Sequence, residues 1–416
     1  MRKVYVAGGA CTSFIGKFHP DFIWKKHPDF GKKENPDLGW YVRQAGLDAL
    51  IEAQATAAVV DKAYVGNFAG ELFDNQGHLG AMLASADPDL DSKPIMRVEG
   101  ACASGGLAVS AAVDAIRAGA DVALVVGAEV QTTRSAKDGA DFLARAADYK
   151  RQRDIDPFTF PCLFARRARA VFEQTDTTAE DCARAAVKAY ANANRNPLAH
   201  MRTVKMTLEQ ASAASDSNPT FLANPEYRDY LRVSDCSQVS NGGAGLVLCS
   251  AEGLERIGRP MAACTEIVAC EVATAPLTAD PNPLALDNTA TAARRAYDRA
   301  GLTAGSIQVA EVHDCFTVTE ILMYEALGFA DAGKGAQLLR DGETELSGRI
   351  PVNTGGGLVG FGHPVGATGI KQVLELHRQI KGQCGDYQLP STPTVGLAAN
   401  MGGDDRTSVV MICREP

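Results

Sequence analysis

The sequence lacks the features of several other classes of protein. No uninterrupted apolar run reaches the roughly 18 residues that a membrane helix needs, and the first residues contain no apolar segment of the kind found in secretion signals. The formal net charge of -9 and the isoelectric point near 5.4 leave no broad basic face for nucleic acid or anionic lipid. The last residues, Arg414-Glu415-Pro416, are not a peroxisomal signal. We therefore expect a cytoplasmic protein with no nucleic-acid or membrane partner.

The cysteines are arranged in a way that excludes two common uses. Their number, 11, is odd, and no two of them form a Cys-x-x-Cys pair. A disulfide framework and a thiolate zinc site are therefore not indicated, and we predict no metal. Most of these cysteines should be small buried side chains, so any catalytic one has to be recognised by its neighbours.

Short apolar segments alternate with helical patterns along the chain, which is typical of an α/β layered fold. Residues 4–8 and 121–127 have the composition of strands, and the second is apolar enough to be covered on both faces. Residues 104–118 are rich in alanine and glycine, as expected for a helix buried between layers. A chain of 416 residues should form about two or three domains.

The order of these segments returns in the last third of the chain. A repeat of this length indicates the duplication of one α/β unit. We predict an N-terminal half of residues 1–260 and a C-terminal half of residues 261–416. The corresponding segments are 49–68 and 297–316, 100–105 and 362–367, and 122–127 and 394–399.

Residues 132–232 interrupt this order and predict an inserted loop domain, because they are richer in charged and aromatic residues and have little strand signal. Between residues 131 and 170, nine Lys or Arg residues outnumber five Asp residues, a local excess of +4 in a chain of net charge -9. This excess is equally compatible with a solvated helix face and with a phosphate-binding surface.

Cys102 is the first candidate for chemistry. It lies in a Gly-Ala-Cys-Ala-Ser-Gly segment, residues 100–105, at the predicted start of a buried helix. The free amides and the dipole at a helix N-terminus favour a thiolate, and the small neighbours leave room for a substrate. A structural cysteine buried among alanines is the alternative interpretation.

His363 is the best candidate for a base that would activate a nucleophilic cysteine. It is flanked by Gly362 and Pro364 in a loop that should enter a helix, which suits a base better than a packing residue. The preceding residues 355–360 formally match the Gly-x-Gly-x-x-Gly pattern of dinucleotide-binding proteins. They do not lie between the strand and helix of a first βαβ unit, so we predict no nucleotide site.

Two further polar segments follow predicted strands. The first is His313-Asp314-Cys315-Phe316, at the carboxyl end of a strand, where open α/β sheets place their sites. A strand terminus with a capping aspartate is the alternative. The second is residues 400–405, which form an ordinary turn or present a backbone N–H to an oxyanion. If the two halves are wound alike, Cys102, His313 and His363 can converge at one end of the layers.

In this order and spacing, the four segments resemble the thiolase superfamily, most closely the sterol-carrier-protein-2 type thiolases with a His-Asp-Cys-Phe motif. The likeness extends from residues 4–8 to residues 409–412. It implies duplicated βαβαβαββ halves in a five-layer α-β-α-β-α arrangement, with a loop domain inserted in the first half. It also implies a homodimer or a dimer of dimers, and a function in lipid or fatty acid metabolism.

The resemblance implies a role for each candidate residue. Cys102 is acylated, and His363 takes its proton and then joins His313 in holding a thioester oxygen. The backbone amides of Cys102 and Gly402 form a second oxyanion hole.

The sequence departs from many thiolases at position 400, where it has Asn400 in place of a second acid-base cysteine. In the branch with the His-Asp-Cys-Phe motif, that duty is expected to pass to Cys315.

The implied activity is that of an acetyl-CoA acetyltransferase or 3-ketoacyl-CoA thiolase. Such an enzyme cleaves a 3-ketoacyl-CoA with CoA, or runs the reverse Claisen condensation, by a ping-pong mechanism through acyl-Cys102. Acyl-CoA and CoA are the substrates, and no cofactor is required.

Two alternatives remain open. One is a thiolase-like subunit that works with a small zinc-ribbon/OB-fold partner on a specialised CoA thioester, by thiolysis or retro-aldol cleavage. The presence of Cys102 favours thiolysis, because aldol cleavage needs no acyl-cysteine. The other alternative is a catalytically silent acyl-CoA-binding scaffold.

Overall fold

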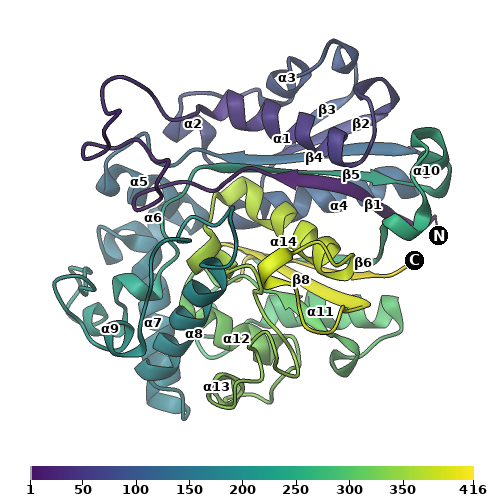
Figure 1. The fold of residues 1–416 in the computed structure, drawn as a ribbon. Coiled ribbons are helices and arrows are strands. Elements are labelled where there is room, and N and C mark those ends of the chain that lie inside the picture. The colour runs from purple at the N-terminus through teal and green to yellow at the C-terminus, as the bar shows by residue number, and fades with distance from the viewer. Residues whose placement is uncertain (1) are drawn as a thin grey trace.

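The computed structural model describes residues 2–416, and its strands form one continuous system in the order β3-β2-β4-β5-β1-β6-β9-β8-β7 (Figure 1). The strands are β1 (Tyr5–Cys11), β2 (Lys62–Gly66), β3 (Ile95–Val98), β4 (Val122–Glu129), β5 (Gly242–Cys249), β6 (Thr265–Thr274), β7 (Val309–Glu311), β8 (Val395–Gly402) and β9 (Thr407–Arg414).

The helices alternate with these strands, as the sequence predicts. They are α1 (Leu38–Glu52), α2 (Gly70–Phe73), α3 (Leu79–Ala84), α4 (Ser104–Arg117), α5 (Ala136–Leu143), α6 (Tyr149–Gln152), α7 (Thr159–Gln174), α8 (Ala179–Ala193), α9 (Leu208–Ser212), α10 (Ala251–Ile257), α11 (Asp287–Ala300), α12 (Thr317–Ala326), α13 (Gly335–Arg340) and α14 (Val365–Ile380). Within residues 2–416, none of them is long and apolar enough to cross a membrane.

The two halves of the chain repeat one pattern of strand pairing. In the first half, β2 pairs parallel with β3 and β4, β4 pairs antiparallel with β5, and β5 pairs antiparallel with β1. In the second half, β7 pairs parallel with β8, β8 antiparallel with β9, and β9 antiparallel with β6. On the other side of β7, Ala310 forms a parallel bridge with Val352, which corresponds to the pairing of β2 with β3 in the first half. The predicted duplication is confirmed, whereas the boundary at residue 260 stays a prediction.

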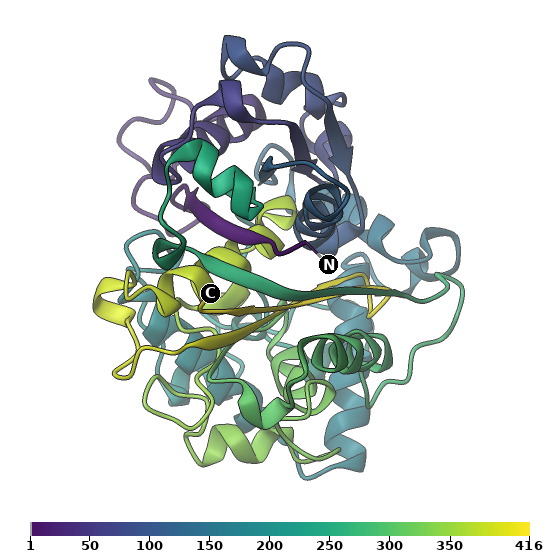
Figure 2. The ribbon, with the colours of Figure 1, turned by 90° about the vertical axis from the view of Figure 1, so that its right-hand side faces the viewer.

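The helices and half-sheets form the predicted five layers, and the antiparallel pairing of β1 with β6 joins the two half-sheets. Helices α1 and α3 cover the outer face of the first half-sheet, α11 and α12 cover that of the second, and α4 and α14 lie side by side between them (Figures 1 and 2). Apolar side chains from α4, α14 and both half-sheets form a shared buried cluster in the middle layer.

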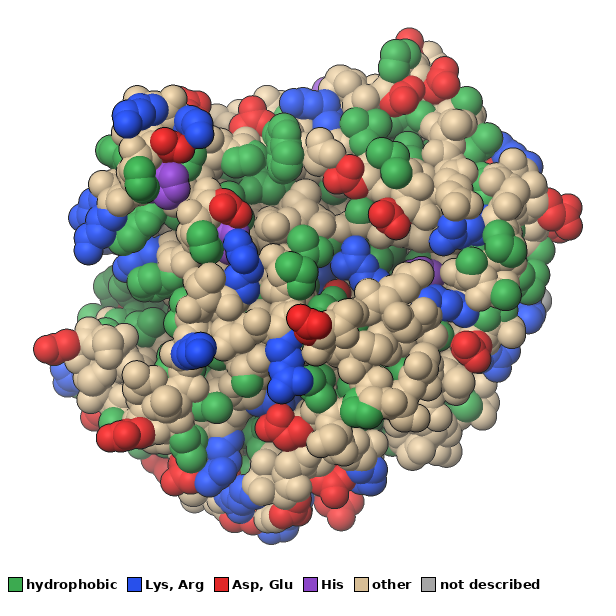
Figure 3. All heavy atoms as spheres, in the orientation of Figure 1, with side chains coloured by type: hydrophobic (Ala, Val, Ile, Leu, Met, Phe, Trp, Pro, Cys, Tyr) green, Lys and Arg blue, Asp and Glu red, His purple; other side chains and the backbone are tan. Residues whose placement is uncertain are grey.

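Residues 132–232 lie between β4 and β5 and contain helices α5 to α9. In Figure 1 they occupy the lower left of the molecule, and α8 packs against α12 and α13 of the second half. The predicted insertion in the first half is confirmed. On the face drawn in Figure 3, acidic and basic side chains are interspersed rather than gathered into a broad basic surface, in agreement with the net charge of -9.

Helices α4 and α14 approach each other closely because both carry glycines near their N-termini. A Cβ atom on Gly105 would lie 2.7 Å from the carbonyl oxygen of Gly366, and a Cβ atom on Gly369 would lie 2.2 Å from the amide nitrogen of Gly106. Larger side chains would therefore push the helices apart. Since the segments that precede both helices hold candidate catalytic residues, this contact sets the separation of those residues.

Replacing Gly369 with alanine is expected to lower the free energy of unfolding by about 2–3 kcal/mol, because the added methyl group meets the backbone of α4. The midpoint of urea unfolding measures this change. Gly139→Ala is a matched control in helix α5, where a Cβ atom would lie an ordinary 3.4 Å from Phe73. Helix propensity predicts no loss, or a gain of up to about 1 kcal/mol, for the control. An unchanged midpoint for Gly369→Ala would contradict the close contact.

Candidate active site

Cys102 lies in a short turn, Ala101–Ala103, that leads directly into α4, and it is 6% exposed. Ala101 has a left-handed backbone conformation with φ of 53°, which is unfavourable for a residue with a side chain. The Ser104 hydroxyl accepts a hydrogen bond from the Gly100 amide and donates one to the Ala101 carbonyl oxygen, which holds this conformation. Cys102 therefore stands at a helix N-terminus, as the sequence predicts.

His363 lies in the loop that enters α14. Gly362 has φ of 116°, and a Cβ atom there would lie 2.8 Å from Ser240 Oγ, so only glycine fits. His363 Nδ1 lies 2.6 Å from Thr368 Oγ1, and the Thr368 hydroxyl donates to the Pro364 carbonyl oxygen at 3.1 Å. Because the hydroxyl has a single hydrogen, His363 Nδ1 donates to it and Nε2 carries the lone pair. The imidazole is therefore oriented to accept a proton at Nε2.

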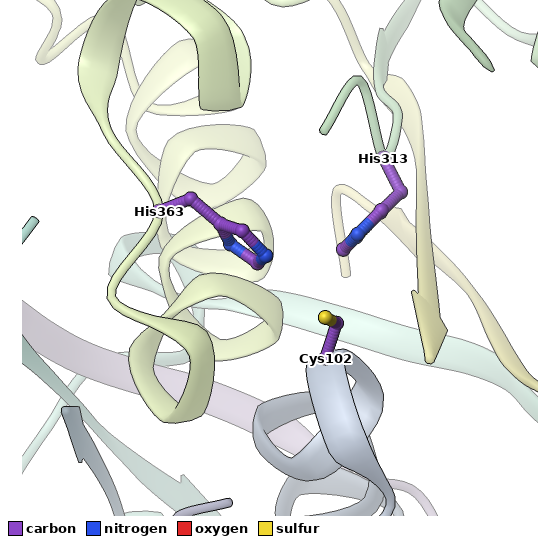
Figure 4. Close-up of side chains that lie close together, drawn as sticks. All are labelled: Cys102, His313 and His363. Atoms are coloured by element: carbon purple, nitrogen blue, oxygen red, sulfur yellow. The ribbon is translucent and has the colours of Figure 1, made fainter. Parts of the chain in front are cut away.

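His313 follows β7 and faces His363 across the site. Their ring centroids are 5.1 Å apart and the rings are nearly perpendicular, at 86°. The Nε2 atoms of both rings are buried and have no hydrogen-bond partner in the described chain, residues 2–416. One nitrogen of each ring and the Cys102 sulfur lie within 4.8 Å of one another, and Figure 4 shows both rings directed toward that sulfur. The structure thus brings together the three side chains whose convergence the sequence predicts.

Asn400 is in contact with two of these three residues. Its Oδ1 accepts a hydrogen bond from the Gly106 amide at 3.0 Å. Its Nδ2 lies 3.1 Å from the Cys102 carbonyl oxygen and 3.2 Å from His313 Nδ1. The sequence marks position 400 only as a departure from the family pattern, so these contacts could not be predicted from it.

Asp314 holds the glycine-rich loop in place rather than facing the thiol. Its carboxylate accepts hydrogen bonds from the amides of Leu358 at 2.6 Å and Val359 at 3.4 Å. These amides belong to a single π-helical turn, Gly357–Phe361. Gly357 has φ of 61°, and a Cβ atom there would lie 2.3 Å from Asp314 Oδ2. The glycines therefore make room for a buried carboxylate, and the segment is not the strand-to-helix turn of a dinucleotide site.

Cys315 lies beside the cluster, just before α12, and is 4% exposed. The next residue, Phe316, stacks on Phe164 of α7 with ring centroids 4.4 Å apart, which fixes the segment against the loop domain. Burial, together with the neighbouring Cys102 thiol, holds the pKa of Cys315 well above its ordinary value. The access of its sulfur to a substrate α-carbon stays a prediction.

Gly402 is the last residue of β8 and lies against the Cys102 turn, because a Cβ atom on it would be 2.1 Å from the Gly100 carbonyl oxygen. The amide of the next residue, Gly403, lies near enough to the Cys102 thiol to lower its pKa, against the larger increase that burial causes. Gly403 is a functional candidate that the sequence analysis missed, and its place in a Gly-Gly pair is the only local signal for it. The oxyanion role of the Gly402 amide stays a prediction.

Glu129, the last residue of β4, is fully buried and connects the two halves near the site. Its carboxylate accepts hydrogen bonds from Asn67 Nδ2 at 3.0 Å and from the amides of Phe68 at 3.0 Å, Ala69 at 2.9 Å and Gly366 at 3.0 Å. Burial raises the pKa of Glu129 to about 7, and the hydrogen bonds from the backbone oppose that increase. Since the Gly366 amide belongs to the first turn of α14, Glu129 ties β4 to the helix that follows His363.

Burial governs the acid-base chemistry of the cluster. It raises the pKa of the Cys102 thiol to about 12, with a smaller contribution from Glu129, and lowers the pKa of His363 to about 3. Burial and the neighbouring His363 hold the pKa of His313 well below its ordinary value. The expectation that the helix N-terminus favours a resting thiolate is therefore wrong, since burial outweighs it. At neutral pH the thiol and both imidazoles are uncharged.

By distance alone, the same three side chains could hold a metal ion. Among residues 2–416, Cys102, His313 and His363 are the only such group that comes together, and zinc accepts one thiolate and two imidazoles as ligands. An imidazole binds a metal only through an unprotonated nitrogen. The position of each ring proton therefore decides whether the cluster can act in this way.

Two family models match the chain. One is described as "Thiolase, N-terminal domain" and matches residues 33–252, and the other is described as "Thiolase C-terminal domain-like" and matches residues 270–415.

Individual proteins match along most of the chain. An acetyl-CoA acetyltransferase from Methanothermobacter thermautotrophicus is 37% identical over 89% of this chain and 93% of its own length. The benzoylsuccinyl-CoA thiolase subunit BbsB from Thauera aromatica is 30% identical over 97% of this chain and 96% of its own length. The structure of an Ltp2-ChsH2(DUF35) aldolase has a TM-score of 0.76 at 21% identity and covers 98% of this chain and 97% of that one, which supports the fold.

A Cys102→Ala variant is expected to have the same thiolate absorbance in the ultraviolet as the wild type between about pH 6 and pH 9, because a thiol whose pKa is raised stays protonated there. The difference spectrum of the two proteins measures this quantity, and it should grow only as the pH approaches about 12. His363→Gln is the control and should not change the absorbance either. A thiolate signal at neutral pH that disappears in both variants would reveal an ion pair instead.

Proposed function

The chain belongs to the thiolase family and is an acyltransferase, and on that premise we propose that it exchanges acyl groups between CoA thioesters through an acyl-Cys102 intermediate. The observation that carries this proposal is the convergence of three side chains: the Cys102 sulfur and one nitrogen each of His313 and His363 lie within 4.8 Å of one another. The Nε2 atoms of both rings have no hydrogen-bond partner in the described chain. A buried thiol beside a base and a second polar group is what nucleophilic acyl transfer requires.

In the degradative direction, Cys102 attacks the keto carbon of a 3-ketoacyl-CoA while His363 Nε2 takes the thiol proton. The carbon–sulfur bond forms, and the bond between the keto carbon and the α-carbon then breaks, with its electron pair passing to the enolate of acetyl-CoA. Cys315 protonates that enolate. The Cys315 thiolate takes the proton of free CoA, whose sulfur attacks the acyl-Cys102 thioester. The bond between the acyl carbon and the Cys102 sulfur breaks, the Cys102 thiolate recovers its proton from His363, and the shortened acyl-CoA is released. These proposed steps transfer no electrons to or from a carrier. That CoA acts as a substrate and that no cofactor is required stay predictions.

Negative charge develops on an oxygen at two points of this reaction, and preformed N–H donors would stabilise it. We assign one oxygen to His313, joined by His363 once it carries the thiol proton. The amides of Cys102 and Gly403 both act to lower the pKa of the Cys102 thiol, and we place the second oxygen near them, with Gly402 as the donor that the family resemblance implies.

The proposed acid, Cys315, is supported by its protonation. A thiol whose pKa is held high by burial remains protonated at neutral pH and can donate to a carbanion. The Cys102 thiol contributes to this high pKa, which supports the assignment of both thiols to one reaction.

Incubation with acetyl-CoA is expected to add one acetyl group to the wild type and to Cys315→Ala, and none to Cys102→Ala, because Cys102 alone forms the thioester. Intact-mass spectrometry measures the adduct. Overall thiolysis should be lost in both variants. Cys102→Ala cannot form the acyl-enzyme, and Cys315→Ala is acylated but cannot donate or remove the α-carbon proton.

Cys162→Ala provides the matched control, since this cysteine is fully buried in α7 and should leave both labelling and thiolysis intact. An unlabelled wild type would contradict the acyl-enzyme. An acetyl adduct on Cys102→Ala would show that another residue carries the acyl group.

Two hollows on the loop domain are candidates for the phosphates of CoA. One, of about 350 Å³, is lined by Arg166 and Arg169 together with Glu173 and Glu226. The other, of about 310 Å³, is lined by Arg151 and Arg166 together with Asp154 and Asp280. Arg166 thus lines both, and it also lies 3.6 Å from Asp404, just beyond the glycine pair at the thiol. Arginine binds phosphate oxygens through charge-assisted hydrogen bonds. We therefore assign the basic surface of the loop domain to the phosphates rather than to a merely solvated helix face.

Arg166→Ala is expected to raise the KM for CoA about tenfold with little change in kcat, because one charge-assisted contact is worth about 1.5 kcal/mol. Steady-state kinetics at varied CoA concentration measure both constants. Arg184→Ala, on α8, removes a comparably exposed arginine that pairs with Glu180 and should change neither constant. An unchanged KM for Arg166→Ala would contradict the phosphate assignment and favour the interpretation of this surface as a solvated helix face.

A second candidate function is that of a subunit acting with a small zinc-ribbon/OB-fold partner on a specialised CoA thioester. Two similar proteins favour it, since one is a benzoylsuccinyl-CoA thiolase subunit and the other is an aldolase that includes a DUF35 component. Acetyl labelling of Cys102 would favour thiolysis over aldol cleavage. The homodimeric assembly, the cytoplasmic location and the place in lipid metabolism stay predictions.

A further inference from the structure

The orientation of the Asn400 side chain is determined by two backbone groups. The Gly106 N–H needs an acceptor, and Asn400 Oδ1 lies 3.0 Å from it. The Cys102 carbonyl oxygen needs a donor, and Asn400 Nδ2 lies 3.1 Å from it. Exchanging the oxygen and nitrogen of the amide would set donor against donor and acceptor against acceptor. The buried side chain therefore has one satisfactory orientation.

This orientation directs the second N–H of Asn400 at His313 Nδ1, which lies 3.2 Å from Nδ2. An amide nitrogen cannot accept a hydrogen bond, so His313 Nδ1 has to carry the lone pair. The single proton of the neutral imidazole is then on Nε2, which is buried without a hydrogen-bond partner among residues 2–416 and belongs to a ring that points toward the Cys102 sulfur in Figure 4.

We propose that Asn400 is a positioning residue that fixes His313 as its Nε2–H tautomer, which makes His313 a hydrogen-bond donor and prevents it from binding a metal ion with Cys102 and His363. The donor role rests on the proposed acyl transfer, in which a thioester oxygen receives this N–H. The tautomer itself follows from the hydrogen bonds alone.

The neighbours of the two histidines thereby fix them as opposite neutral tautomers. Thr368 accepts from His363 Nδ1, which leaves the lone pair of His363 on Nε2. Asn400 donates to His313 Nδ1, which puts the proton of His313 on Nε2. One imidazole is a base toward the thiol and the other is a donor toward an oxygen, although both are buried and uncharged.

The same tautomer removes one ligand from the potential metal site. A metal-bound histidine normally donates its other ring N–H to an acceptor. His313 Nδ1 faces a donor instead, so coordination through Nε2 would place two N–H groups against each other. Loss of Asn400 should relieve this conflict and allow the three side chains to close on a zinc ion.

The ring nitrogens of 15N-histidine-labelled protein can be observed directly by long-range 1H–15N correlation NMR, and His313→Gln identifies the signals of His313 among the 7 histidines. In the wild type we expect an unprotonated Nδ1 and a protonated Nε2. In Asn400→Ala the two tautomers should be mixed. A protonated Nδ1 in the wild type would overturn the proposal without need of any variant.

Asn400→Ala is also expected to lower kcat for acetyl transfer by about 10- to 100-fold with little change in KM, because His313 is no longer held as a donor. Its affinity for Zn²⁺, measured by competition with a chromophoric chelator, should rise at least about tenfold and fall again in the double variant with Cys102→Ala. Unchanged or weaker Zn²⁺ binding would contradict the exclusion of metal.

Asn218→Ala is the matched control. Asn218 is also buried between backbone groups, accepting from the Ser234 amide and donating to the Gln210 carbonyl oxygen in the loop domain. It should lose stability without changing the His313 tautomer, kcat or Zn²⁺ affinity. The failure of the proposed function would appear as an unlabelled wild-type Cys102, whereas the failure of this inference would appear in the NMR spectrum, whatever the activity.

Discussion

The contact between the glycine-bearing ends of α4 and α14 is the constraint on which the rest of the site depends. At Gly105 and Gly369, the backbones of the two helices are too close for any side chain. One helix belongs to each half of the duplicated fold, and the residues just before them carry Cys102 and His363. Neither half holds the complete set of groups, so the chemistry exists only because the two halves meet at this glycine contact.

Buried carboxylates hold the loops that this contact brings together. Glu129 accepts hydrogen bonds from the loop after β2 and from the first turn of α14, and Asp314 accepts them from the turn that precedes His363. Backbone amides at such tight turns have no hydrogen-bond partner within a helix or a sheet, and burying an amide without a partner lowers the free energy of unfolding. The carboxylates satisfy these amides and give the catalytic loops a single arrangement, which is the preorganisation that stabilisation of a developing charge requires.

Burial decides the chemical character of the cluster. A charged resting pair would have to be desolvated, so the thiol and both imidazoles remain neutral, and in the proposed acyl transfer the proton moves only when Cys102 attacks a substrate. In such a site, the direction of each hydrogen bond, rather than a charge, decides which group donates a proton and which accepts one. Thr368 and Asn400 give the two histidines opposite functions through their Nδ1 atoms, without any ionised side chain at the reacting atoms.

The sequence by itself determined the local features: the order of strands and helices, the duplicated unit, the inserted loop domain, Cys102 at a helix start and His363 beside its glycine. These follow from the residue pattern of single segments and from the order of the segments along the chain. Only the tertiary structure decided the roles of Glu129, Gly403 and Asn400, and it reversed the expected effect on the Cys102 pKa. Their partners lie far away in the sequence and act through burial and hydrogen-bond direction, which exist only once the two halves are packed together.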